Sequence, residues 1–289
     1  MSAPPVAAAR RFGARLAAAV ERHGPLCVGV DPHPPLLAAW GLDDDAAGVE
    51  RFGRTVVEAV AGHVAALKPQ AAFFERHGSR GVAALERVVA DAREAGLLTV
   101  VDAKRGDIGS TMAAYADAFA GDSPLAGDAV TASPYLGFGS LRPLLDVAAA
   151  HGRGVFVLAL TSNPEGPGVQ HATGADGRSV ARAIAEAAAA ENAGAPVMGD
   201  VGLVVGATVG TAVRDLGIDL AAVNGPLLAP GVGAQGATAA DLRAVFGDAR
   251  RYVLAASSRE VLSAGPDAHA LREAARRSAE AVRAALAED

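Results

Sequence analysis

Cysteine is almost absent from this sequence, since Cys27 is the only one in 289 residues. A single cysteine excludes an internal disulfide and any zinc site built from cysteines, and it is typical of a reducing compartment. Long hydrophobic runs are also missing, and none approaches the roughly 20 apolar residues of a transmembrane helix. Segment 1–20 is rich in Ala and Arg and predicts an amphipathic helix rather than a signal peptide. We therefore expect a cytoplasmic protein.

The chain has no basic tract, and its net charge is −6. This balance argues against nucleic acid or an anionic membrane as a partner. The seven histidines show no metal-ligand spacing, so we predict no metal site. What the sequence does have is hydrophobic residues, at 51% of the chain, enough for a large core and too many for a disordered protein.

Short apolar runs alternate with segments of helical periodicity, and no linker divides the chain. The predicted strands are 26–30, 64–68, 97–102, 129–131, 155–160, 201–205, 227–229 and 252–256. The predicted helices are 49–61, 82–95, 110–119, 141–151, 179–192, 209–216, 239–246 and 268–286. Such continuously apolar strands suit a parallel sheet covered by helices. About eight alternations predict an α/β fold, a (β/α)₈ barrel formed by residues 1–289 as one domain, with an additional helix at each end. A doubly wound open sheet is the alternative, because alternation does not distinguish an open sheet from a closed one.

The most informative segment follows the third predicted strand, where apolar residues give way to alternating charges. Asp102 and Lys104 are two residues apart, so both point to one side of an extended chain, and Asp107 follows a glycine-containing turn. One interpretation is a strand end closed by a surface ion pair. The other is a functional cluster, because charges that directly follow a buried strand line the mouth of the core, where burying them together is costly.

The pattern Asp-x-Lys-x-x-Asp-Ile-x-x-Thr, complete at Asp102, Lys104, Asp107, Ile108 and Thr111, resembles the signature of the orotidine 5′-monophosphate decarboxylase family. The version found here is similar to the longer bacterial, type 2 subgroup. The resemblance implies a TIM-barrel lyase that converts orotidine 5′-phosphate to UMP and CO₂ in de novo pyrimidine biosynthesis, without a cofactor. It also implies a homodimer in which Asp107, Ile108 and Thr111 reach into the partner's site.

The resemblance further implies a role for each charge. The reaction leaves a carbanion at C6 of the pyrimidine, which preorganised charges must stabilise. Lys104 is expected beside C6, where it then donates the replacing proton. Asp102 is expected to face the departing carboxylate, Lys68 to contact the ribose and support the cluster, and Asp31 to bind ribose hydroxyls.

Other loops are expected to bind the base and the phosphate. Ser162 matches the serine that contacts the pyrimidine, with Thr161 and Asn163 as alternative donors. The glycines at 231, 233 and 236 form a Gly-x-Gly-x-x-Gly pattern, but no acidic residue ends the next strand, so a dinucleotide site is not expected. The same glycines suit a barrel phosphate site. The residues expected there are Gly233, Gln235, Ser258 and Arg259, although many relatives carry glycine where this chain has Ser258.

Two other functions compete with this interpretation. A magnesium-dependent sugar-phosphate decarboxylase or aldolase could share the barrel and the Asp-x-Lys-x-x-Asp strand, but the Ile-x-x-Thr and Gln/Arg features favour the nucleotide enzyme. A catalytically inactive barrel that only binds a phosphorylated ligand would not require Asp and Lys buried together.

Overall fold

The computed structural model describes residues 11–232 and 236–287. Eight parallel strands form a closed barrel, in which each strand pairs with its neighbours in the sequence and β8 pairs with β1. The predicted (β/α)₈ barrel is therefore confirmed, and the open doubly wound sheet is wrong. The strands are β1 Leu26–Val30, β2 Ala66–Pro69, β3 Leu98–Arg105, β4 Ala129–Ala132, β5 Gly154–Leu160, β6 Val201–Val205, β7 Leu227–Pro230 and β8 Val253–Ser257.

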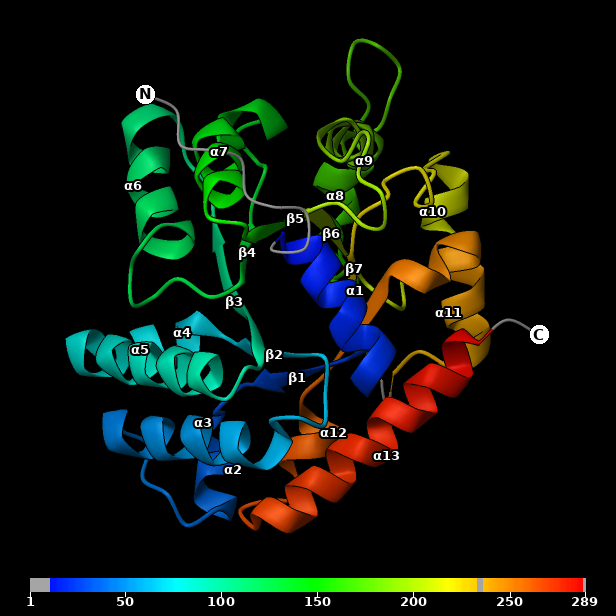
Figure 1. Ribbon diagram of the computed structural model, residues 1–289. Helices are drawn as coiled ribbons and strands as arrows, with labels where there is room; N and C mark the ends of the chain where they lie inside the picture. The colour runs from blue at the N-terminus through cyan, green and yellow to red at the C-terminus, as the bar shows by residue number, and fades with distance from the viewer. Residues whose placement is uncertain (1–10, 233–235, 288–289) are drawn as a thin grey trace.

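The helices form a ring around the barrel (Figure 1). They are α1 Phe12–His23, α2 Pro34–Ala39, α3 Ala46–Val60, α4 Ala71–Glu75, α5 Gly78–Glu94, α6 Gly109–Ala120, α7 Arg142–Ala150, α8 Pro167–Gln170, α9 Val180–Glu191, α10 Ala212–Asp215, α11 Ala239–Phe246, α12 Arg259–Leu262 and α13 Ala268–Leu286, with 3₁₀ helices η2 Phe138–Leu141 and η3 Gly247–Tyr252. No helix within the described ranges is both long and apolar enough to cross a membrane.

The core has two layers, as the alternation of side chains along barrel strands requires. One cluster lies between the strands and the surrounding helices. The other fills the barrel interior and includes Cys27 of β1, Val100 of β3, Ala129 of β4 and Phe156 of β5.

Helix α1 closes the N-terminal end of the barrel and lies in the middle of the helix ring in Figure 1. Its Phe12 and Leu16 belong to the interior cluster, and the Phe12 ring packs edge-on against Phe156. A Cβ atom on Gly154 would overlap the Phe12 ring, so this close approach needs a glycine on β5.

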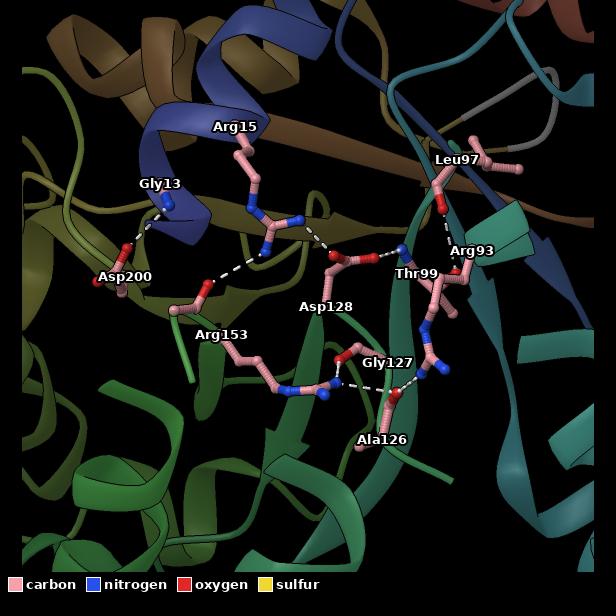
Figure 2. Close-up of polar contacts among 11 residues, drawn as sticks. Gly13, Arg15, Arg93, Leu97, Thr99, Ala126, Gly127, Asp128, Arg153 and Asp200 are labelled. Carbon is pink, nitrogen blue, oxygen red and sulfur yellow. Dashed lines mark hydrogen bonds and ion pairs between the residues drawn. The ribbon is translucent and has the colours of Figure 1, made fainter. Parts of the chain in front are cut away.

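Polar contacts attach α1 to the strand ends (Figure 2). The Arg15 guanidinium donates to the Asp128 carboxylate and to the Gly152 carbonyl, and the Gly13 N–H donates to Asp200 over 2.9 Å. Asp128 also accepts the backbone N–H of Thr99. Helix α1 thus covers the N-terminal end of the barrel, opposite the mouth formed by the C-terminal ends of the strands.

Candidate functional site

Charged side chains from adjacent strands meet inside the C-terminal mouth of the barrel. Val100 belongs to the interior cluster, so Asp102, two residues later on β3, points to the same side. Lys68 comes from β2, next to β3. The Lys68 and Asp102 side chains are buried near the C-terminal ends of their strands, where they contact each other rather than bulk water.

The Asp102 carboxylate lies between two ammonium groups. Lys68 Nζ is 3.2 Å from Asp102 Oδ2, and Lys104 Nζ is 2.6 Å from Asp102 Oδ1. The side chains of Lys68 and Asp102 are only 8% and 9% exposed, whereas that of Lys104 is 44% exposed. Lys104 therefore carries its charge on the open side of the cluster, where a ligand can meet it.

For Asp102 and Lys68, the neighbouring charges and hydrogen bonds together outweigh the effect of burial on the pKa. Burial raises the pKa of Asp102, but the neighbouring Lys68 and Lys104 and the hydrogen bonds that it accepts outweigh burial, and the net pKa is lowered. Burial lowers the pKa of Lys68, but Asp31 and Asp102 outweigh it, and that pKa is raised. Both groups are therefore held in their charged forms at neutral pH.

The backbone of Lys104 adopts an uncommon conformation, with φ of 48° in the left-handed region. A non-glycine residue there costs on the order of 1–3 kcal/mol, and such strain is concentrated at functional sites. The Lys104 N–H donates to the Thr131 hydroxyl of β4 over 2.9 Å, and that hydroxyl donates to Asp102 Oδ1 over 2.7 Å. The strained residue and the central carboxylate thus share one partner.

A cavity of about 470 Å³ opens beside Lys68, between the loops that follow β1, β7 and β8. Asp31, Gly231, Ser258 and Arg259 are among its lining residues. Asp31 Oδ1 is buried and has no hydrogen-bond partner among the described residues. An unpaired buried acceptor is costly, so this atom is available to a ligand hydroxyl group.

Arg259 begins α12, two residues after the end of β8, and is exposed. Gly231, directly after β7, lines the cavity and has φ of 90°, in the left-handed region that favours glycine. A guanidinium group at this end of a barrel suits a phosphate group.

The predicted residues are only partly brought together in one protomer. Lys68 belongs both to the charge cluster with Asp102 and Lys104 and to the cavity with Asp31, Ser258 and Arg259. Four predicted residues lie outside both the charge cluster and the lining of this cavity: Asp107, Ile108, Thr111 and Ser162. Gly233 and Gln235 lie outside the described residues.

The segment after β3 faces outward. The Asp107 carboxylate accepts the Ile108 N–H over 2.8 Å, and the Asp107 N–H points to Met112 Sδ at 3.3 Å. Ile108 is 62% exposed, and Thr111 on α6 is also exposed. Ser162, after β5, is exposed as well.

Sequence reasoning missed three contributors to the mouth of the barrel. Thr131 holds Asp102 and Lys104, and Gly29 leaves room for the Ser258 side chain. Arg105 pairs with Glu75 and lies over the Tyr115 and Phe119 rings at 5.6 and 5.1 Å, which fixes the end of β3. One signal in the sequence was available: the chain has only two lysines, Lys68 and Lys104, and both lie in the cluster.

The arrangement combines a cation on the open side of a buried carboxylate with an adjacent pocket for hydroxyl and phosphate groups. Within the described part of the chain, no cluster of three or more His, Cys, Asp or Glu side chains is placed to hold a metal ion. Chemically, the cluster can stabilise an anion that develops beside Lys104 and can supply a proton to it.

Comparison with known proteins gives consistent matches. The model of the orotidine 5′-phosphate decarboxylase / HUMPS family matches residues 24–274. Orotidine 5′-phosphate decarboxylases of Salinispora arenicola and Streptomyces coelicolor are 64% and 62% identical over 276 and 277 residues, which in both cases cover 95% of this chain and 98% of the relative.

Solved structures agree in fold. The crystal structure of a Streptomyces avermitilis protein, 62% identical, matches with a TM-score of 0.91 and covers 99% of this chain and 97% of that one. The Leishmania donovani OMP decarboxylase, 34% identical, matches with a TM-score of 0.73 and covers 94% of this chain and 99% of that one.

Proposed function

The chain belongs to the orotidine 5′-phosphate decarboxylase family, and we propose that it performs this reaction with the charge cluster and cavity at the mouth of its barrel. It is a carboxy-lyase that converts orotidine 5′-phosphate to UMP and CO₂ in de novo pyrimidine biosynthesis. The observation that carries the site assignment is the position of Asp102 between the chain's only two lysines, with the exposed ammonium on the open side.

The mechanism follows from the charges. When the bond between C6 and the carboxylate breaks, the electron pair stays on C6 and CO₂ leaves. The Lys104 ammonium group stabilises that pair and then donates one of its protons to C6, which gives UMP. Asp102 lies beside the departing carboxylate and also holds Lys104 in place through its 2.6 Å contact.

The remaining residues bind the parts of the substrate that do not react. Asp31, with its unpaired acceptor, and Lys68 contact the ribose hydroxyl groups. Arg259 and the 258 position bind the phosphate, together with Gly233 and Gln235. Ser162 contacts the pyrimidine from the loop after β5. Binding energy from the phosphate, far from C6, is then available to assemble the site.

The decisive assay follows the fall in ultraviolet absorbance of orotidine 5′-phosphate with purified protein in excess EDTA. We expect rapid turnover that is lost in Lys104→Ala and kept in Arg276→Ala, which removes an exposed cation of α13 instead. Absence of turnover by folded protein, with magnesium-dependent activity on a sugar phosphate, would instead assign the chain to the rival metal-dependent enzyme class.

We further propose a cytoplasmic homodimer whose two sites are shared. Three large apolar side chains are exposed near the ends of β3 and β4: Ile108 at 62%, Leu136 at 53% and Tyr135 at 78%. The two loops are neighbours, because the Ser133 N–H donates to the Arg105 carbonyl. A second copy that covers this patch would bring Asp107, Ile108 and Thr111 to the partner's cavity.

Hybrid dimers test the sharing directly. If Asp107 completes the partner's site, mixing inactive Lys104→Ala chains with inactive Asp107→Ala chains restores activity, because one site of each hybrid then has both native residues. If Asp107 serves its own chain, every site in the hybrid remains defective. Sedimentation velocity of the wild type and of Tyr135→Glu tests the interface, and we expect a dimer and a monomer, respectively.

A further inference from the structure

The pairing of β3 with β4 is irregular at the site. Val101 lies opposite Val130, and the next paired residue, Arg105, lies opposite Ala132. Three residues of β3, 102–104, therefore face the single residue Thr131 of β4. A bulge of this kind redirects side chains and leaves backbone groups without their partners in the sheet.

The Thr131 side chain takes the place of one missing partner. Thr131 is 1% exposed and points into the barrel mouth, two positions after interior Ala129. It accepts the Lys104 N–H over 2.9 Å. Because that N–H can only donate, the single hydroxyl proton is free for the second contact, to Asp102 Oδ1 at 2.7 Å.

The two contacts make Lys104 dependent on Thr131 at both ends of the residue. The main chain of Lys104, with its left-handed φ of 48°, is held by the Thr131 oxygen. Its ammonium group lies 2.6 Å from Asp102 Oδ1, the same oxygen that Thr131 fixes. A residue without a hydroxyl group at this position would give the Lys104 N–H no side-chain acceptor and would donate no hydrogen bond to Asp102 Oδ1.

We propose that Thr131 is a positioning residue for the decarboxylation, whose hydroxyl holds the Asp102 carboxylate and the Lys104 backbone in the one arrangement that places the Lys104 ammonium beside C6. This inference rests on the proposed site. Thr131 acts through its neighbours rather than on the substrate, so removing its hydroxyl should slow the chemical step more than it weakens nucleotide binding.

The test compares side chains of matched size. Thr131→Val keeps the shape and removes the hydroxyl, and Thr131→Ser keeps the hydroxyl. We expect kcat of Thr131→Val to fall roughly 10- to 100-fold, as for loss of a buried hydrogen bond to a charged group. The Kd for UMP, measured by calorimetry, should stay within about twofold, and Thr131→Ser should retain most of kcat.

Thr99→Val is the matched control, because Thr99 is a buried threonine of β3 at the opposite end of the barrel (Figure 2). We expect it to turn over like the wild type. If Thr131→Val does not fold, Thr131→Ala against Thr131→Ser gives the same comparison of a side chain with and without the hydroxyl.

A kcat for Thr131→Val within twofold of wild type would overturn the proposal. Equal losses in the serine variant and in the variants without a hydroxyl would also overturn it, because they would indicate packing alone. Full activity of Lys104→Ala would refute the proposed site itself, whatever the Thr131 variants do.

Discussion

Gly29 of β1 lies directly against Ser258, the residue that precedes α12. A Cβ atom at position 29 would overlap the Ser258 Oγ and would lie 3.0 Å from Asp31 Oδ2. The glycine therefore gives the serine its place beside the cavity, and Asp31 and Ser258 both line that cavity. This contact joins the expected ribose-binding residue to the expected phosphate-binding loop.

The first prediction concerns this contact. Gly29→Ala should displace Ser258 and Asp31 and raise KM, by roughly tenfold if the overlap costs the usual 1–3 kcal/mol of overpacking. The double variant Gly29→Ala/Ser258→Gly should recover most of the lost kcat/KM, because glycine at 258 frees the space. Steady-state kinetics of the wild type, Gly29→Ala, Ser258→Gly and the double variant form a double-mutant cycle. A double variant no better than Gly29→Ala would show that the two residues do not compete for space.

The second prediction separates chemistry from binding. Lys104→Ala removes the group expected to stabilise the carbanion and donate the proton, whereas Arg259→Ala removes only a contact to the phosphate. We expect Lys104→Ala to lower kcat by several orders of magnitude more than Arg259→Ala, whose main effect should be on KM. The measurement is kcat and KM for orotidine 5′-phosphate. Small and comparable losses in both variants would refute the two roles.

The third prediction is a pH dependence of stability. The pKa of Asp102 is lowered in the folded protein from its ordinary 3.8, although burial opposes this, because Lys68 and Lys104 flank the carboxylate. Its contribution to the free energy of unfolding is therefore complete above that ordinary value, and it is lost as the pH falls through the lower folded pKa.

Urea unfolding at pH 7 and at successively lower pH below 4 tests this linkage in the wild type and in Asp102→Asn. The variant lacks the titrating group, so its unfolding free energy should decrease less on acidification. An equal decrease in both proteins would show that Asp102 does not contribute to acid destabilisation.

The fold was predictable because each barrel strand contains a continuous apolar run, which can be recognised from the local sequence alone. The predicted strands all overlap observed ones, and the main differences are small shifts of their ends, such as the extension of β3 to Arg105. The short helices α2, α4, α8 and α12 were not predicted, because four to six residues do not display a helical period.

The site was predictable only where its residues are close in sequence. Asp102 and Lys104 form a local pattern on one strand, and the pattern predicted their shared direction correctly. Thr131 and Ser258 act through contacts with residues far away in the chain, and no local pattern encodes such contacts. The bulge that brings Thr131 against Lys104 is likewise a property of two paired strands rather than of either sequence.

The last prediction concerns the only thiol. Cys27 is fully buried in the barrel interior, and burial raises its pKa to about 12, against a smaller opposite effect of Lys68. Because the thiolate is the reactive form, Cys27 should not react with iodoacetamide at pH 7 in the native protein and should react in urea. Ala18→Cys, on the exposed face of α1, is the matched control and should be labelled at once. Mass spectrometry of the labelled Ala18→Cys protein gives the labelling rates of Cys27 and of the control cysteine. Native labelling of Cys27 as fast as that of the control cysteine would mean that the barrel interior opens readily to solvent.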